Sequence, residues 1–243
     1  MKPILSVMTG ASLLVVHSLM AEQLSSYTIR RTSTPIAIDA KLDEPAWQKA
    51  PLVGDFFFNW WTEGEKEKTD VRILWDDTNL YIAYFCHDKH ISAYVTQRHG
   101  PVSKDDAVEV FISPNPNRLN NYYTFEINAI GTMLNRCKAD WWTGGPTWDP
   151  TGVEYRTSFQ DLAVREELPN DREWIVELAI PFANFARDAT HTPPRDGDTW
   201  RLNLYRTGGI TNRQDSSWSP IPPGPHSFHR PESFGVVQFS NHE

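Results

Sequence analysis

Two glutamates, Glu109 and Glu126, stand in successive segments in which apolar and polar residues alternate. Successive side chains of a strand point to opposite faces of a sheet, so each segment has one apolar face and one face that carries a carboxylate. If the two segments pair in register, both carboxylates project from one sheet surface. Aromatic residues accompany them, which indicates a polar recognition surface; an ordinary solvated sheet face is the alternative.

Two carboxyl groups on adjoining strands have a second chemical use. A retaining glycoside hydrolase holds an acid and a nucleophilic carboxylate about 5 Å apart, and neighbouring strands can reach that separation. Such an enzyme must raise the pKa of one carboxyl by enclosing it. A strand surface without a deep cleft is a poor environment for that shift, so we predict that Glu109 and Glu126 bind a ligand and catalyse nothing.

The elements that must position these carboxylates are short strands separated by turns. Asp76 to Asn79 is a strong turn signal between two apolar runs, and Leu42 to Ala50 suits a short helical turn. We predict one all-β domain over residues 34–240, an antiparallel β-sandwich (jelly-roll or immunoglobulin-like) with short helical turns. The predicted strands lie within residues 34–38, 55–61, 71–75, 80–86, 104–128, 132–137, 153–159, 173–180, 200–206, 217–219 and 234–239.

The first 21 residues have the composition of a secretory signal peptide. Lys2 precedes a short apolar stretch, Ala21 follows it as a small residue, and Thr9, Ser12 and His17 interrupt it. No later run approaches the length of a membrane-spanning helix. We therefore expect signal-peptide removal, a secreted or periplasmic location, and no insertion into a membrane.

Composition narrows the range of partners. The formal net charge of -8 argues against a nucleic-acid partner, which requires a basic face. The two cysteines, Cys86 and Cys137, are able to pair in an oxidising compartment, but two separate buried thiols are favoured. Asp39, Asp43 and Glu44 lack the dense alternating spacing of a calcium loop, so we predict a capped turn there, no metal and no cofactor.

The ten tryptophans divide into two groups. Trp47, Trp75, Trp174 and Trp200 lie in strand or helix patterns and are expected in the core, whereas Trp218 is ambiguous. A Gly/Pro-rich loop carries three more, which either bind a ligand or pack within the loop: Trp141, Trp142 and Trp148.

Six segments occur in the order seen in family 9 carbohydrate-binding modules, and together they span nearly the whole chain after the signal peptide. They are IAIDAKLDEPAW, TDVRILWDDTNLYIAYFCHD, KDDAVEVFISP, YYTFEINAIGT, EWIVELAIPF and RPESFGVVQF. The chain thus resembles that family, which shares a broader β-sandwich fold of the DOMON type. The resemblance implies a shallow sugar site on one sheet, binding without cleavage, and a partner that is an oligo- or polysaccharide.

The resemblance also implies roles for particular residues. The acidic residue that hydrogen-bonds sugar hydroxyls falls on Glu109, the polar residue of the next strand on Glu126, and the amide contact on Asn203. The family clamps its sugar between two tryptophans; one of these positions is Phe228 here, and the other is Ser103.

The loss of the second clamp ring is a departure from the family pattern. A neighbouring ring, either Trp61 or one from the loop containing Trp142, is expected to replace it if a sugar is clamped. Arg98, together with His99 and Arg230, is a further predicted donor to the hydroxyl rim.

Four functions remain open from the sequence. The leading one is an exported, non-catalytic carbohydrate-binding protein that supports polysaccharide breakdown beside an unknown glycoside hydrolase. The others are a haem-binding DOMON-type domain, the hydrolase described above, and a structural domain that has lost its sugar site. The haem alternative needs Met133 beside a histidine, for which the sequence offers His87, His226 and His229.

Overall fold

The computed structural model describes residues 23–142, 148–159 and 173–243, except for the side chains of Trp141 and Trp142. The expected signal peptide at 1–21 lies outside the described residues. Within them the regular secondary structure is almost entirely strand. The strands are β1 (Ser26–Arg31), β2 (Phe57–Asn59), β3 (Thr69–Trp75), β4 (Asn79–His87), β5 (Ala107–Ser113), β6 (Tyr123–Asn128), β7 (Met133–Cys137), β8 (Glu154–Thr157), β9 (Glu173–Pro181), β10 (Thr199–Thr207), β11 (Asp215–Ser217) and β12 (Gly235–Ser240).

Helical structure in the described part of the chain is limited to single turns. The elements are α1 (Pro45–Lys49), α2 (Lys138–Trp142) and the 3-10 turns η1 (Val102–Lys104), η2 (Phe182–Phe185) and η3 (Pro231–Ser233). The predicted helical turn within Leu42 to Ala50 is thereby confirmed as α1. None of the helices described is long and apolar enough to cross a membrane.

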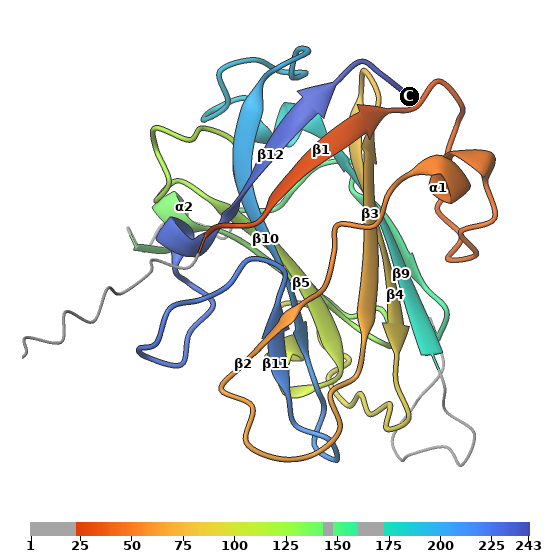
Figure 1. The fold of residues 1–243 in the computed structure, drawn as a ribbon, viewed down its shortest axis with the longest axis vertical. Coiled ribbons are helices and arrows are strands. Elements are labelled where there is room, and N and C mark those ends of the chain that lie inside the picture. The colour runs from red at the N-terminus through yellow and green to blue at the C-terminus, as the bar shows by residue number, and fades with distance from the viewer. Residues whose placement is uncertain (1–22, 143–147, 160–172) are drawn as a thin grey trace, which may run out of the picture.

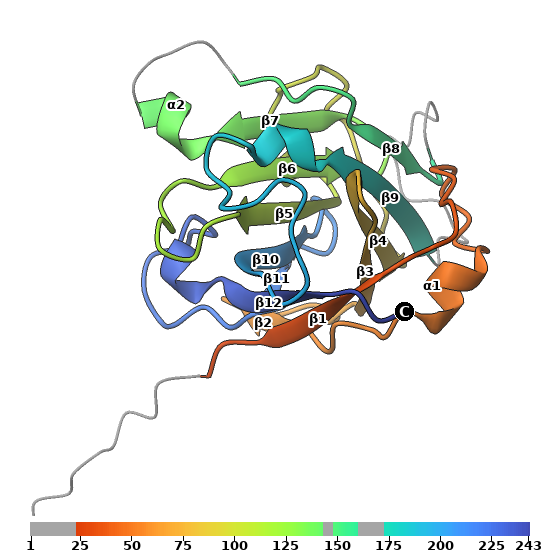
Figure 2. The same cartoon turned by 90° about the horizontal axis from the view of Figure 1, so that it is seen from above.

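One continuous sheet folds back on itself to make the sandwich. Its strand order is β7-β6-β5-β10-β12-β1-β3-β4-β9-β8, and β11 and β2 continue from β10. The half containing β5, β6 and β10 packs against the half containing β3, β4 and β9 (Figures 1 and 2). The predicted β-sandwich is confirmed, and the pairing is antiparallel except at β1, which is parallel to both β12 and β3.

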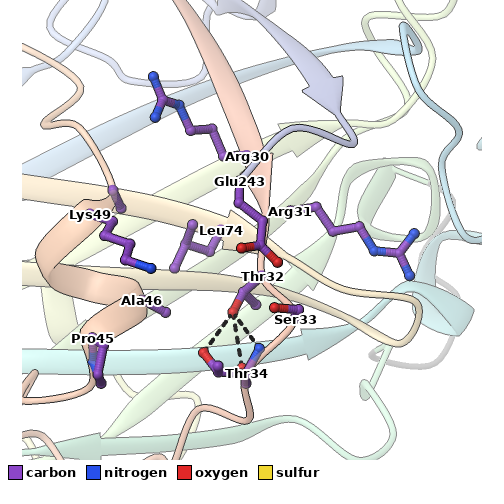
Figure 3. Close-up of a pocket in the computed structure, with 11 residues that line it drawn as sticks. Arg30, Arg31, Thr32, Ser33, Thr34, Pro45, Ala46, Lys49, Leu74 and Glu243 are labelled. Atoms are coloured by element: carbon purple, nitrogen blue, oxygen red, sulfur yellow. Dashed lines mark hydrogen bonds between the residues drawn. The ribbon is translucent and has the colours of Figure 1, made fainter.

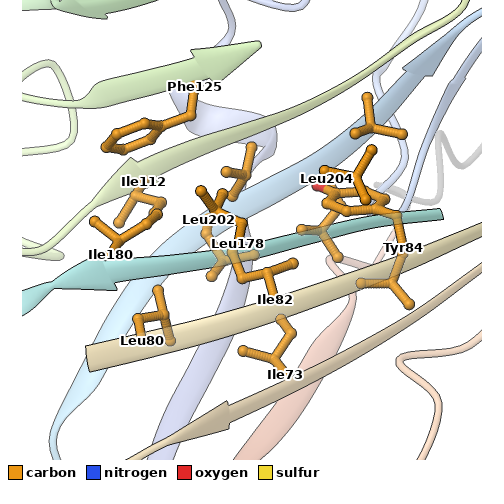
Figure 4. Packing of buried hydrophobic residues seen from close by; sticks show 14 of the residues in the cluster. Ile73, Leu80, Ile82, Tyr84, Ile112, Phe125, Leu178, Ile180, Leu202 and Leu204 are labelled. Atoms are coloured by element: carbon orange, nitrogen blue, oxygen red, sulfur yellow. The ribbon is translucent and has the colours of Figure 1, made fainter. Parts of the chain in front are cut away.

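The core lies between the two halves and receives the apolar side of each strand. Val108, Val110 and Ile112 of β5 enter it, as do Phe125 and Ile127 of β6. Period-two alternation therefore leaves the remaining side chains of these strands on the opposite face. Figure 4 shows the contact between the halves through Ile73, Leu80, Ile82, Tyr84, Ile112, Phe125, Leu178, Ile180, Leu202 and Leu204.

The expected core tryptophans are confirmed. Each is at most 2% exposed, and Trp218, which the sequence left ambiguous, is buried as well; the five residues are Trp47, Trp75, Trp174, Trp200 and Trp218. Cys86 and Cys137 are both buried and free. The favoured prediction of two separate thiols is correct.

One predicted strand is wrong. Residues 34–38 form no strand; Ile36 and Ile38 pack instead on Trp47 of α1. Their alternation reflects this local packing and not pairing in the sheet. β1, which the sequence did not predict, occupies the place between β12 and β3, so the sheet includes residues that precede the predicted domain start at 34.

A buried ion network supports the end of β10 and the loop that follows it. Arg206 is fully buried and contacts Asp88 at 2.8 Å and Glu67 at 3.4 Å. The Glu67 carboxylate also accepts hydrogen bonds from the side-chain amides of Asn212 at 2.9 Å and Gln214 at 2.7 Å. Because buried charges must be paired and hydrogen-bonded, this network fixes the loop between β10 and β11.

We predict that Glu67→Ala lowers the free energy of unfolding by about 3–5 kcal/mol, since it removes one of the two carboxylates that pair with the buried guanidinium of Arg206, and this carboxylate also accepts from two buried side-chain amides. Urea denaturation of the variant measures the loss. The matched control is Glu65→Ala, which removes a carboxylate whose ion pair with Lys89 is exposed. A Glu67 variant as stable as the control would contradict the role given to the network.

Candidate functional site

Glu109 and Glu126 are direct neighbours across the pairing of β5 with β6. Residues opposite each other in an antiparallel pair point to the same face. Tyr205 of β10 is opposite Glu109 on the other side, and Leu134 of β7 is opposite Glu126. The predicted register is confirmed, and the two carboxyl groups lie side by side on the sheet face that points away from the core.

A pocket lies on this face, between the strands and the loop that contains His226 to His229. Its floor comes from β5, β6, β7 and β10, and its rim comes from η1, β11 and the loops around them. The lining residues are Pro101, Ser103, Glu109, Phe111, Glu126, Leu134, Arg136, Thr207, Arg213, Asp215, His226, Ser227, Phe228 and His229.

Both central carboxyl groups are deeply buried. Glu109 is 3% exposed and Glu126 is 5% exposed, so the alternative of an ordinary solvated face does not hold. Burial raises the pKa of Glu109 well above its usual value, and the nearby carboxylates of Glu126 and Asp215 add to the rise. Burial also raises the pKa of Glu126, to about 7. One of the pair therefore retains a proton at neutral pH.

Two arginines flank the carboxyl pair. The charges of Arg213 and Arg136 both oppose the rise in the pKa of Glu109, and Arg136 also acts on Glu126. Arg213 donates hydrogen bonds to the carbonyl oxygens of Ser103 at 3.1 Å and Gly208 at 3.2 Å. Basic and acidic groups thus occur together in the pocket, which suits a ligand that both donates and accepts hydrogen bonds.

Phe228 forms part of the pocket wall, with one face of its ring covered. Its ring stacks on Tyr205, with centroids 4.2 Å apart and an interplanar angle of 15°. The Tyr205 hydroxyl donates to the carbonyl oxygen of Phe228 at 3.1 Å. Trp60 lies 5.9 Å from the Phe228 ring. This aromatic stack holds the loop that contains Phe228 against the sheet.

Two histidines join the same loop to its surroundings. His226 Nε2 lies 2.7 Å from the carboxylate of Asp215, and its ring stacks on Trp60 at 4.3 Å. His229 Nδ1 lies 2.9 Å from the hydroxyl of Tyr122. Burial lowers the pKa of His229 to about 4, so this ring is neutral at pH 7 and shares a hydrogen bond with the Tyr122 hydroxyl.

The pocket unites some of the predicted site residues and omits others. Glu109, Glu126 and Phe228 meet there, and Ser103 lies at the same pocket. Asn203 is fully buried: its amide donates to the carbonyl oxygen of Ser219, and its side-chain oxygen accepts from two backbone N–H groups. Because Asn203 is not exposed, it does not make the predicted contact with a sugar.

The other predicted contacts are not brought to the pocket. Arg98 donates to Asn135 at 2.9 Å and pairs with Asp149 at 2.6 Å, and it is not part of the lining. The side chain of Trp142 lies outside the described residues. Trp148 packs edge-on against Tyr123 and Phe125 of the core, so it does not replace the missing clamp ring.

Several pocket residues were not predicted as sugar contacts. Arg136 is two residues after Leu134 on β7 and so lies on the same face of the sheet. The alternation within residues 132–137 therefore indicates that Arg136 lies on the pocket face. Asp215 reaches the pocket through the pairing of β11 with β10, and Arg213 reaches it from the loop just before β11; no local pattern indicates either. His226 and His229 were considered only as haem ligands.

The structure does not bring Met133 beside His226 or His229, as axial ligation of a haem by this pair would require. Met133 is buried in the core, whereas His226 and His229 line the pocket on the other face of the sheet. Among the described residues, no group of three or more His, Cys, Asp or Glu is arranged to hold a metal ion.

A second hollow lies between α1 and β1 (Figure 3). Arg31, Lys49, Leu74 and Glu243 are among its lining residues, and the Thr32 hydroxyl donates to the carbonyl oxygen of Thr34. It contains none of the residues predicted for the site. The candidate site is therefore the pocket around Glu109 and Glu126.

Comparison with known proteins agrees with this fold. The family model for carbohydrate-binding family 9 matches residues 37–239. A crystal structure of a candidate carbohydrate-binding protein from Bacteroides uniformis is similar, with a TM-score of 0.74 and 22% identity over 90% of this chain and 100% of the other. No curated protein matches the chain.

A family 9 module from Caldicellulosiruptor kristjanssonii has been solved with two sugars. Its complex with cellotriose gives a TM-score of 0.63 at 15% identity, covering 90% of this chain and 95% of that one. Its complex with glucose gives 0.61 at 13% identity, covering 90% and 97%. Fold and family together define the class, a β-sandwich carbohydrate-binding module. The chain belongs to carbohydrate-binding family 9.

We predict that Glu109→Gln changes how stability depends on pH. The folded-state pKa of Glu109 lies above the unfolded value of about 4.3. Its contribution to stability is therefore full below pH 4.3 and is lost as the pH rises toward the folded-state pKa, by at most about 1.4 kcal/mol per pH unit. The glutamine variant should gain stability relative to wild type between pH 5 and pH 8.

Urea denaturation at a series of pH values measures this difference. The two proteins should be closest in stability near pH 4, where Glu109 is protonated in both folded and unfolded chains, and this comparison serves as the internal control. A constant offset at every pH would mean that Glu109 is not held protonated by its site.

Proposed function

We propose that this protein is exported and binds an oligo- or polysaccharide in the pocket around Glu109 and Glu126, without chemical change to the sugar. Family membership supports sugar binding, and the similar modules bound to cellotriose and glucose support a saccharide as partner. The signal-peptide pattern of residues 1–21 supports secretion or a periplasmic location. A role beside an enzyme that degrades polysaccharides follows from export and binding together.

The observation that carries the proposal is the pair of buried carboxyl groups between two arginines. A sugar hydroxyl donates one hydrogen bond and accepts others, so it fits a surface that offers both acceptors and donors. Glu109 and Glu126 offer two carboxyl groups side by side, and Arg136 and Arg213 add donors. Hydrogen bonds to ionised groups are stronger than those between neutral groups.

The aromatic contribution inside the pocket is smaller than in a two-ring clamp. Phe228 has one face against Tyr205, and Ser103 stands where the family has its second tryptophan. At roughly -0.3 kcal/mol per heavy atom, a disaccharide of about 23 atoms reaches about -7 kcal/mol, or near 10 μM. Loss of one clamp ring moves the expected affinity of this pocket toward the millimolar range.

The raised pKa values of the carboxyl pair keep one alternative, a glycoside hydrolase, worth testing. A retaining enzyme needs one carboxyl ionised as nucleophile and one protonated as acid. The pair meets the second requirement, but family 9 consists of binding modules. Incubation with cellotriose and with aryl glycosides, followed by product analysis, should yield no hydrolysis; turnover that Glu126→Gln abolishes would make the protein an enzyme.

Binding is tested first by screening the wild-type protein against plant and microbial polysaccharides and against cellotriose and glucose. We expect at least one to bind, and titration calorimetry then gives its affinity. Failure of the wild type to bind any saccharide would overturn the proposal in favour of a structural domain.

We predict that Glu126→Ala and Phe228→Ala each weaken the affinity for the bound saccharide at least tenfold. The first removes a charged hydrogen-bond acceptor, worth about 1.5–3 kcal/mol; the second removes the ring that shapes the pocket wall. The matched control is Arg98→Ala, an exposed side chain outside the lining, which should bind as wild type does. Unchanged affinity in both pocket variants, with circular dichroism showing intact folding, would place the site elsewhere.

A further inference from the structure

The sheet face that carries the pocket continues past it to β2. Glu109 lies opposite Tyr205 of β10, Tyr205 lies opposite Ser217 of β11, and Ser217 lies opposite Phe57 of β2. Directly paired residues share a face, so these four side chains form one row across the sheet. Figure 1 shows β2 beside β11 at the end of this row. The pocket face therefore ends at an aromatic strand.

Three aromatic residues lie close together in the sequence at the end of β2, and we call them the aromatic ledge: Phe57, Trp60 and Trp61. Phe57 is 44% exposed and Trp61 is 39% exposed. Large aromatic side chains bury most of their area when they serve only to pack. The ledge is thus more open than a packing role requires.

The ledge adjoins the pocket through His226. This histidine lines the pocket and stacks on the ring of Trp60, with centroids 4.3 Å apart. Trp60 also lies 5.9 Å from Phe228, the aromatic residue of the pocket wall. A chain that leaves the pocket over His226 meets Trp60 next.

The backbone holds the ledge in a conformation that costs energy. Trp60 has a φ of 57°, in the left-handed region that a bulky residue seldom adopts. The Asn59 amide beside it donates to Ser217 Oγ at 2.6 Å and so ties this segment to β11. Lys66 lies over Trp61 at 4.5 Å. Such strain persists where surrounding contacts enforce it, and it is concentrated at ligand-binding sites.

We propose that the bound saccharide is a chain longer than the pocket, and that its further sugar units stack on the aromatic ledge. The inference rests on the proposed function and extends it from the pocket to a second binding surface. A pyranose has an apolar C–H face that packs on an open aromatic ring. The ligand class is therefore an oligo- or polysaccharide segment and not a single sugar.

The test compares saccharides of increasing length. Glucose, cellotriose and cellohexaose, with matching length series of any other glycan found in the screen, are titrated into wild type, Trp61→Ala and Trp61→Phe. Wild-type affinity should rise with length, and Trp61→Ala should bind the longest members about three- to tenfold more weakly, the worth of one aromatic contact. The phenylalanine variant retains a ring and should lose less.

The control is the monosaccharide or shortest ligand that binds. Trp61→Ala should leave its affinity unchanged, because Trp61 is not part of the pocket lining. Nuclear magnetic resonance should show the indole N–H signals of Trp60 and Trp61 shifting with long ligands more than with short ones.

The outcomes separate the inference from the proposed function. Binding that does not increase with length, or that Trp61→Ala weakens equally at every length, overturns the ledge and leaves the pocket proposal intact. No binding of any saccharide by wild type overturns both.

Discussion

The register of β5 against β6 is the constraint on which the site depends. It places Glu109 opposite Glu126, and period-two alternation then sends Val108 and Val110 into the core on the other side. A shift by one residue would exchange the faces, exposing apolar side chains and burying carboxyl groups in the sandwich. The burial of apolar side chains in the core therefore also determines which side chains lie on the polar face. The positions of Glu109 and Glu126 follow from this burial.

Two clusters of buried ionisable groups in this molecule illustrate different uses of charge. Around Arg206 each carboxylate faces a cation or an amide, and the network holds the loop after β10. Beside Glu109 lies another carboxyl group, that of Glu126, and burial raises the pKa of both. Ion pairs stabilise the cluster around Arg206. The cluster around Glu109 instead buries two adjacent carboxyl groups, which costs free energy of folding. Carboxyl groups whose pKa values are strongly shifted by burial occur most often at functional sites.

Alternation within single segments predicts most of the strands, the core tryptophans and the shared face of Glu109 and Glu126, because those features depend on neighbours close in sequence. The sugar contact of Asn203 was predicted from the family resemblance, but its amide is buried and donates to Ser219, a contact that local pattern does not contain. Arg213 enters the pocket from the loop that precedes β11, and Trp60 adopts a left-handed backbone. Both features depend on tertiary structure, so no local pattern in the sequence indicates either of them.

The distribution of rings and charges over the face determines what each part can recognise. Inside the pocket, Phe228 has one face against Tyr205, so carboxyl and guanidinium groups dominate, and these read the positions of individual hydroxyls. At β2 the proposed contacts are rings, with Lys66 over Trp61, and a ring senses only the C–H face of a sugar. Under the proposed function, selectivity resides in the pocket, while contact of a longer chain with the ledge adds affinity that is tolerant of sugar identity. Such a division would allow a pocket lacking one clamp ring to hold a polymer, since weak contacts on one chain act together.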